Sequence, residues 1–369
     1  MRLLFILLLV PSVFFAQQDH THRLSRVLNF PDIPGYKTLK TDLHQHTVFS
    51  DGSVWPDIRV MEALMDGLDV ISLTEHLEYQ PHQADMPHPD RNRSYQIALE
   101  EAKDHDLIII HGAEVTRKMP PGHNNAVFIE DANLLMIKDS LKVFEEANRQ
   151  GGFVFWNHPH WEAQRKDGVA RLEPFHRELI AKNLLHGIEV INDLTISDEA
   201  LQIALNHNLT IMGTSDVHGL VDWRYGIQKG GHRPITLVFA TERKPEAVRE
   251  ALFNRQTVAF FGQTLVGRQN FLNPLLQYSI NFKEAAYQGD THIVTIKIIN
   301  DTGIDFTLLN KSKYTFHNAS DLLIVKTGET MLQVKTLKKL SEIALQFEVL
   351  NGVYAPGKHP TLTWQIKID

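Results

Sequence analysis

The residues best suited to chemistry are histidines and carboxylates that follow short apolar runs. Asp42-Leu43-His44-Gln45-His46 closes the run that begins at Leu39. Alternate residues of an extended segment face the same side, so His44 and His46 point into one space. Two imidazoles presented in this way are typical of metal ligands, although a lone His-x-His pair is a weak signal. The chain has no cysteine, which excludes thiolate metal sites and cysteine nucleophiles.

Further apolar runs are flanked by residues of the same kinds. They contribute Thr74-Glu75-His76, Gly112-Ala113-Glu114, Gly122-His123, Asn157-His158-Pro159-His160 and Ser215-Asp216-Val217-His218. Barrel and doubly wound enzymes place their sites at one end of the strands, so these side chains are expected to converge. Nitrogen and oxygen donors without sulfur suit Zn, Mn or Fe. The sequence therefore predicts a metal centre.

These residues require strands that alternate with helices. Strands are expected at Leu39–Leu43, Leu68–Leu73, Leu107–His111, Ala126–Ile129, Phe153–Trp156, Gly187–Ile191, Leu209–Met212 and Ile235–Phe239. Helices are expected at Pro56–Met65, Ser140–Arg149, Ser197–Asn206 and Pro245–Asn254. Such alternation favours a parallel α/β sheet or barrel.

The pattern changes after about Gly267. Apolar and polar residues alternate over 343–349 and 361–368, and Asn351-Gly352 between them is a turn signal. This pattern predicts a small antiparallel β-sandwich of roughly 100 residues. Trp364, Tyr354 or Tyr287 could bind carbohydrate there, but Trp364 alternates with Leu362 and Ile366 and is expected in the core.

The motifs D-L-H-x-H-T-x-x-S-D-G, T-E-H, G-x-E, H-P and S-D-x-H occur in this order between about Lys37 and Arg268. This set is similar to that of the polymerase-and-histidinol-phosphatase (PHP) metallophosphoesterases. The resemblance implies a distorted seven-stranded (β/α) TIM-like barrel with two or three divalent metal ions. The C-terminal part resembles the β-module of a secreted phosphodiesterase branch. The expected divisions are a signal peptide (1–16), an N-terminal segment (17–36), the barrel (37–266) and the β-module (267–369).

The resemblance also implies which residues hold each metal ion. The first ion would be held by His44, His46, Glu114 and Asp216. Glu114 would bridge to a second ion, completed by His123 and His158. The third would be held by Asp51, His76 and His218, although many relatives carry histidine where this chain has Asp51. Glu75 is expected to orient a ligand rather than to be one.

Two residues and one segment are further candidates, and each of the two residues has an alternative interpretation. Arg117 could clamp a phosphate oxygen, or could be a surface arginine. His160 could protonate a leaving group, or could pack on Pro159. Asp222-Trp223-Arg224 could line the mouth of the site, with tryptophan as an apolar wall.

The expected chemistry is metal-dependent hydrolysis of a phosphate ester. A bridging Glu114 implies metal ions roughly 3.5–4 Å apart, and water between such ions ionises near neutral pH and attacks phosphorus. A phosphodiesterase is favoured by the resemblance of the C-terminal module. The alternatives are a phosphomonoesterase of the same fold, an amidohydrolase-type metal hydrolase, and a non-catalytic metal- or ligand-binding barrel.

The N-terminus predicts export. Arg2 precedes the apolar run Leu3–Phe15, which is too short for a spanning helix of about 20 residues and is typical of a secretory signal. The mature protein is expected in the bacterial periplasm or outside the cell, free of the membrane. A net charge of −7 argues against nucleic acid as a specific partner and leaves a small-molecule phosphate ester as the expected substrate.

Overall fold

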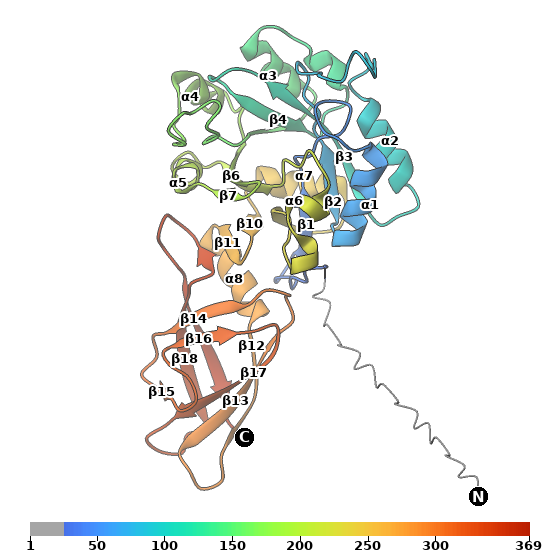
Figure 1. The fold of residues 1–369 in the computed structure, drawn as a ribbon. Coiled ribbons are helices and arrows are strands. Elements are labelled where there is room, and N and C mark those ends of the chain that lie inside the picture. Colours follow the sequence, from blue (N-terminus) through green and yellow to red (C-terminus); the bar gives the residue numbers. More distant parts are fainter. Residues whose placement is uncertain (1–25) are drawn as a thin grey trace, which may run out of the picture.

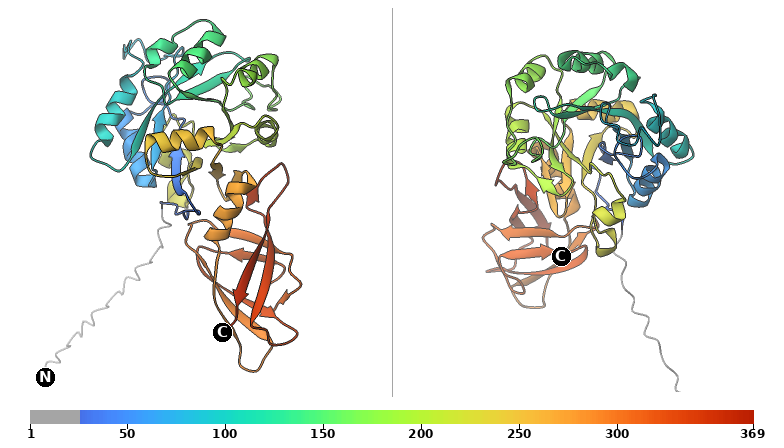
Figure 2. Two further views of the ribbon diagram at one scale, coloured as in Figure 1. Left: turned by 180° about the vertical axis from the view of Figure 1, so that it is seen from behind. Right: turned by 45° about the horizontal axis from the view of Figure 1, so that its top comes forward.

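The computed structural model describes residues 26–369. The predicted signal peptide lies outside the described residues. No helix among the described residues has the length and apolar character needed to cross a bilayer. The described chain forms a curled α/β domain followed by an antiparallel β domain (Figures 1 and 2).

The α/β domain is built on one curled sheet. Strands that share one direction are β1 (Lys37–Asp42), β2 (Val70–Leu73), β3 (Ile108–Thr116), β5 (Phe153–Trp156), β6 (Gly187–Asn192) and β8 (Thr210–Thr214). Antiparallel to their neighbours are β4 (His123–Val127) and β9 (Ile235–Ala240). The sheet is extended by β7 (Thr195–Ile196), β10 (Thr257–Phe261), β11 (Thr264–Gly267) and β19 (Gly352–Val353). The expected α/β barrel is thus present as a curled half-barrel.

Helices surround this sheet. They are α1 (Pro56–Asp66), α2 (Arg93–Ala102), α3 (Ser140–Arg149), α4 (Pro174–Ala181), α5 (Asp198–Asn206), α6 (Val221–Arg224) and α7 (Pro245–Phe253), with short 3₁₀ turns η1 (Ala132–Leu135) and η2 (Ile227–Lys229). Their starts follow from local chemistry: Asp139 and Ser197 accept hydrogen bonds from the first free backbone amides of α3 and α5. Pro245 opens α7, where no amide donor is needed.

Side-chain hydroxyls join β8 to the strands opposite it. Thr236 Oγ1 donates to Gly213 O at 2.8 Å and accepts from Gly213 N at 2.9 Å, and Thr257 Oγ1 donates to Ile211 O at 2.8 Å. A Cβ on Gly213 would lie 2.8 Å from the oxygen of Ile235, so only glycine permits this approach. The curl brings the end of β8 next to the end of β1, which positions the site.

The second domain contains two four-stranded antiparallel sheets. One has the order β12 (Asn281–Tyr287), β13 (Ile293–Asn300), β17 (Gly328–Lys335), β15 (Thr315–Phe316), and the other β16 (Leu322–Val325), β14 (Phe306–Asn310), β18 (Glu342–Val349), β20 (Thr361–Lys367). Trp364 is 6% exposed, and its Nε1 donates to Ile280 O at 3.0 Å. The expected core position of Trp364 is confirmed.

Helix α8 (Gln269–Ser279) lies between the two domains (Figure 1). Its buried Phe271, Leu272, Leu275 and Leu276 belong to one apolar core that continues into both domains. Strand β19, at the predicted turn after Asn351, pairs with β11 of the curled sheet. The two domains are therefore packed together.

Candidate metal centre

Backbone hydrogen bonds on both sides keep the segment after β1 extended. His46 N donates to Val217 O, and Asp216 N donates to His44 O, while Gln45 O accepts from Thr74 N. This pairing places His44 and His46 on the same side, as the alternation predicted, and both side chains are fully buried.

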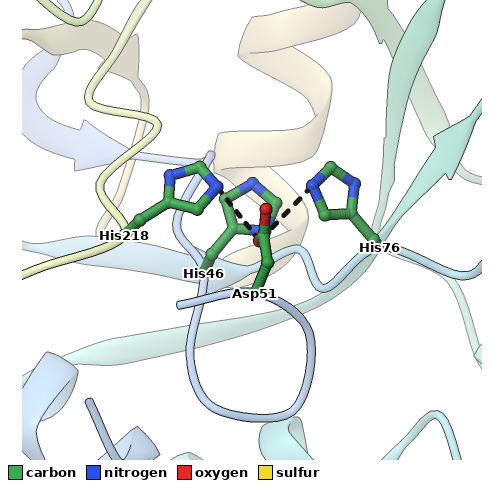
Figure 3. Close-up of side chains that lie close together, drawn as sticks. All are labelled: His46, Asp51, His76 and His218. Atoms are coloured by element: carbon green, nitrogen blue, oxygen red, sulfur yellow. Dashed lines mark ion pairs between the residues drawn. The ribbon is translucent and has the colours of Figure 1, made fainter. Parts of the chain in front are cut away.

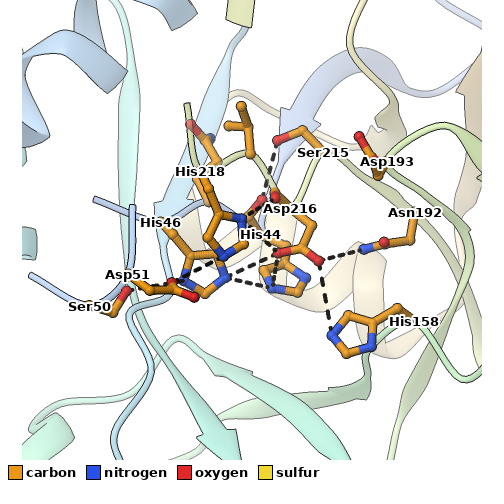
Figure 4. Close-up of polar contacts among 12 residues, drawn as sticks. His44, His46, Ser50, Asp51, His158, Asn192, Asp193, Ser215, Asp216 and His218 are labelled. Carbon is orange, nitrogen blue, oxygen red and sulfur yellow. Dashed lines mark hydrogen bonds and ion pairs between the residues drawn. The ribbon is translucent and has the colours of Figure 1, made fainter. Parts of the chain in front are cut away.

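Four ligand atoms gather at the first metal position, and Figure 4 shows the three residues His44, His46 and Asp216 among those that supply them. They are His44 Nε2, His46 Nε2, Glu114 Oε2 and Asp216 Oδ1. Five atom pairs among them lie 3.1–3.2 Å apart. A tetrahedral ion with bonds of about 2.0 Å needs ligand atoms about 3.3 Å from one another. The geometry therefore fits a divalent cation held by all four residues that the resemblance assigned to the first ion.

Asp51 forms the centre of a second group (Figure 3). Its Oδ1 lies 3.0 Å from His218 Nε2, 3.5 Å from His76 Nε2 and 3.8 Å from His46 Nδ1. The three residues assigned to the third ion are thus together, and His46 joins them. The Asp51 carboxylate therefore lies within reach of all three imidazoles.

Glu114 links two groups of ligands. While Oε2 faces His44 and His46, Oε1 lies 2.5 Å from His123 Nδ1 and 3.3 Å from His76 Nδ1. The antiparallel pairing of β3 with β4 brings His123 opposite Thr116, next to Glu114. A carboxylate placed in this way can bridge two metal ions.

His158 lies on the other side of the centre from Asp51. Its Nε2 is 3.9 Å from Asp216 Oδ2, and its ring is 5.0 Å from that of His123. The group that surrounds Glu114 Oε1 contains His76 and His123 without His158. His158 and Asp216 both have positive φ angles, 27° and 51°, a backbone conformation that is uncommon for non-glycine residues.

The donor atoms of the site are placed to bind metal ions rather than to form hydrogen bonds with one another. Asp51 Oδ1, Glu114 Oε1 and His123 Nδ1 are buried, and although they lie close to other donor atoms of the site, none has a partner with hydrogen-bond geometry among residues 26–369. Buried polar atoms are normally satisfied, and those that are not point to an absent ion or ligand. With nitrogen and oxygen donors only, the site fits two or three divalent cations.

Electrostatics keep the carboxylates of the site ionised. Burial opposes ionisation of Asp216, but His44 and His46 hold its pKa well below the ordinary value. Burial likewise opposes protonation of His44, yet Asp216 and Glu189 raise the pKa of His44 well above its usual range. Burial lowers the pKa of His158 to about 3, so this imidazole is neutral at physiological pH.

His76 is expected to make metal binding depend on pH. Burial opposes its protonation, but Glu114 and Asp51 raise the pKa of His76 to about 10 in the metal-free chain. A cation bound at His76 must displace this proton, so affinity should rise with pH up to about 10. Zn²⁺ added to unbuffered metal-free protein at pH 8 should release protons in a pH-stat, and His76→Gln should release about one fewer. Equal release by both proteins would contradict this role.

A buried carboxylate that the sequence analysis missed supports the first position. Glu189 Oε1 lies 2.7 Å from His44 Nδ1 and accepts from Thr214 Oγ1 at 2.6 Å. Its Oε2 accepts from His158 N at 2.6 Å and from Asn192 Nδ2 at 2.9 Å. The sequence contained one signal for Glu189, because it is the single charged residue in the apolar strand expected at 187–191. A buried charge requires partners, so such a residue points to a polar site nearby.

Glu189→Gln is expected to weaken metal binding without unfolding the chain. The amide keeps the shape but removes the negative charge beside His44 Nδ1, which makes His44 a poorer donor at Nε2. Loss of such a support usually lowers metal affinity by about 10- to 100-fold. Competition with a chelator measures the change, and exposed Glu178→Gln is the control. Unchanged affinity would contradict the assigned role of Glu189.

Glu75 supports the site through Thr47 and Ser50 rather than as a ligand, as expected. It accepts hydrogen bonds from Thr47 N, Thr47 Oγ1 and Ser50 Oγ, and Ser50 Oγ lies 3.2 Å from His46 Nδ1. Glu75 therefore holds the loop that carries Asp51 and contacts His46 through Ser50.

A cavity of about 440 Å³ opens over the centre. Its walls include Trp161, Asp193 and Arg224, and Arg224 Nε donates to Asp193 Oδ1 at 2.7 Å. Arg224 thus lies at the mouth, where the sequence placed it, whereas Trp223 is 83% exposed and does not line the cavity.

The two predicted catalytic residues lie outside the cavity lining. Arg117 pairs with Glu78 Oε1 at 2.9 Å and donates to Ile137 O at 2.5 Å. His160 Nε2 lies 2.7 Å from Thr195 Oγ1. Neither residue is among those that line the cavity, and their catalytic roles stay predictions.

Known proteins match different parts of the chain. A family model described as an Ig-like domain (DUF5001) matches residues 280–365. A search of curated proteins found no match. Two solved structures show limited similarity to this chain. PsfC from Pseudomonas syringae is 16% identical, with 65% of this chain and 96% of that chain covered and a TM-score of 0.44. An amidohydrolase from Chromobacterium violaceum is 16% identical, with 48% of this chain and 87% of that chain covered and a TM-score of 0.35.

One solved structure matches nearly the whole chain. It is a two-domain protein from Bacteroides vulgatus containing a predicted PHP-like metal-dependent phosphoesterase. The two proteins are 40% identical over 92% of this chain and 98% of that chain, with a TM-score of 0.86. Together with the buried histidine and carboxylate groups, this match means that the chain belongs to the PHP-like metal-dependent phosphoesterases, in a two-domain form with a C-terminal Ig-like domain.

Proposed function

We propose that this protein is an exported phosphodiesterase that hydrolyses small-molecule phosphodiesters with the help of two or three Zn, Mn or Fe ions. The observation that carries the proposal is the set of four ligand atoms from His44, His46, Glu114 and Asp216 at tetrahedral spacing. Bound divalent cations would supply a water nucleophile at neutral pH and neutralise the phosphoryl oxygens.

Residues of this chain position the metal ligands and provide a wall for the substrate. Asp216 and Glu114 remain ionised and fix the positions of the imidazoles, so little reorganisation is needed during reaction. Trp161 is 45% exposed at the cavity wall and offers an apolar surface for an organic leaving group.

The charge of the cavity favours a diester over a monoester. Besides Asp51 and Asp216, whose charges bound cations would offset, Asp193 and Arg224 line it and pair with each other. A monoester dianion brings one more negative charge than a diester and needs further cations to balance it. A diester with one negative charge suits these walls better.

Export is supported by the first 16 residues, with their single arginine and apolar run. The net charge of −7 supports a small phosphate ester rather than nucleic acid as the partner.

Hydrolysis of bis(p-nitrophenyl) phosphate and p-nitrophenyl phosphate by metal-loaded protein tests the proposal. We expect two or three ions per chain and a higher kcat/KM for the diester. Preference for the monoester would favour the phosphomonoesterase alternative, and a loaded centre inactive on both esters would overturn the proposal.

A further inference from the structure

A second cavity lies in the Ig-like domain and is separate from the metal centre. Its volume is about 910 Å³, and its lining comes from three segments, residues 291–293, 313–317 and 335–340. Every lining residue belongs to the Ig-like domain. Pockets that bind small organic ligands usually have volumes of about 300–1,000 Å³. The cavity therefore has room for such a ligand.

The floor of this cavity follows from the register of one sheet. Ile293 of β13, Lys335 of β17 and Thr315 of β15 are paired in a row across three strands. Their neighbours Val294, Val334 and Phe316 face the core, so this row lies on the outward face. The inward residues hold the sheet in place while the outward ones are free to contact a ligand.

Hydrogen bonds fix the loops that form the walls. Thr336 N donates to His292 O at 2.8 Å, which ties the loop after β17 to the loop before β13. Tyr287 OH accepts from Leu340 N at 2.6 Å and donates to Lys338 O at 3.3 Å. Walls held in this way form a site before a ligand arrives, which lowers the entropic cost of binding.

The charge of the lining has one sign. Lys313, Lys335 and Lys338 line the cavity, and none forms an ion pair within the described chain. The lining contains no aspartate or glutamate, although the whole chain carries a net charge of −7. Lys313 Nζ lies 5.4 Å from the centre of the Tyr314 ring, which keeps this ammonium at the wall. Three unpaired cations around a fixed hollow complement an acidic ligand.

The remaining lining is apolar. Ile293, Leu337, Leu340 and the Tyr314 ring contribute, and Leu337 is 99% exposed. Burying the exposed Leu337 side chain against an apolar part of a ligand would be favourable, and the neighbouring lysines could bind an acidic group of the same ligand. We propose that this cavity is a binding site for a soluble organic anion, with an apolar body seated on Ile293, Leu337 and Tyr314 and an acidic group held by Lys313, Lys335 and Lys338.

The dye 1-anilinonaphthalene-8-sulfonate has this chemistry, and its neutral analogue N-phenyl-1-naphthylamine lacks the acidic group. Fluorescence titration of the full chain should show one sulfonate site per chain. Replacing Lys313, Lys335 and Lys338 together by glutamine should weaken the sulfonate by about tenfold and leave the neutral dye within about twofold. Leu337→Asn should weaken both dyes.

A matched triple variant of Lys283, Lys326 and Lys367 to glutamine removes the same charge from exposed positions elsewhere in the domain. It should bind the sulfonate like the wild type. Equal binding by the two triple variants would overturn the proposal. Titration of His44→Ala separates the two sites: unchanged dye binding supports the cavity, and lost binding would place the dye at the metal centre and overturn it.

Competition identifies the source of the anion. Decanoate below its micelle concentration should displace the sulfonate dye, which supports a soluble organic acid as ligand. Displacement by phosphatidylglycerol vesicles alone would overturn the proposal in favour of a lipid surface. Failure of both competitors would overturn it as well. Neither result depends on whether the metal centre hydrolyses phosphodiesters.

Discussion

Asp216→Asn is expected to remove the ion from the first metal position and to abolish phosphoester hydrolysis. Asp216 Oδ1 lies 3.1 Å from both His44 Nε2 and His46 Nε2, so it completes the set of ligand atoms there. The amide keeps the size of the side chain but loses the charge that a divalent cation needs. Loss of several kcal/mol of metal stabilisation corresponds to a fall in kcat/KM of about 1,000-fold or more.

Metal analysis and diester hydrolysis on the same sample measure both effects. Asp222→Asn is the matched control, because Asp222 pairs with Arg26 at the surface and touches no proposed ligand. A circular dichroism spectrum like that of the wild type would exclude unfolding as the cause. An Asp216→Asn protein with full metal content and full activity would contradict the ligand set.

Residues whose environment is set locally were predictable from sequence. The helix expected at Ser140–Arg149 has those bounds in the structure, since Asp139 caps its start and its apolar spacing defines one buried face. The extended segment of His44 and His46 likewise needed only the alternation of a strand. The apolar runs also predicted the strands, because a strand covered on both faces must be apolar throughout.

Features that depend on distant contacts were not predictable in the same way. Glu189 matters because the curl of the sheet places it beside His44, 145 residues away in sequence. Arg117 follows Glu114 by three residues, but its position depends on β3, which continues through Thr116, and on the ion pair of Arg117 with Glu78. The sequence therefore indicates which strand ends meet, whereas the surroundings of Glu189 and Arg117 depend on contacts made only in the folded chain.

The buried Arg233 connects the stability of the fold to the position of the metal ligands. Its Nη1 donates to Asp42 Oδ2 at 3.2 Å and its Nε to Asp66 Oδ2 at 2.7 Å. Asp42 also accepts from Ser215 N at 3.1 Å, which ties the end of β1 to the residue before Asp216. Arg233 is 2% exposed, and Asp42 is fully buried. Through Asp42, Arg233 is therefore connected to both the segment that carries His44 and His46 and the segment that carries Asp216.

Arg233→Met is expected to lower the free energy of unfolding by about 3–5 kcal/mol, because it leaves the buried carboxylate of Asp42 without its cation, while Asp66 keeps its ion pair with Arg26. Urea unfolding measures the loss, and Arg171→Met, which breaks an exposed pair with Asp167, should cost at most about 1 kcal/mol.

Burial already raises the pKa of Asp42 even with Arg233 and Ser215 opposing it. Without Arg233 this pKa should rise further, so the folded variant would bind a proton more tightly than the unfolded chain. The deficit relative to wild type should then shrink as the pH falls from 8 to 5 and grow as the pH rises. A deficit that does not change with pH would mean that lost packing, rather than an unpaired Asp42, destabilises the variant.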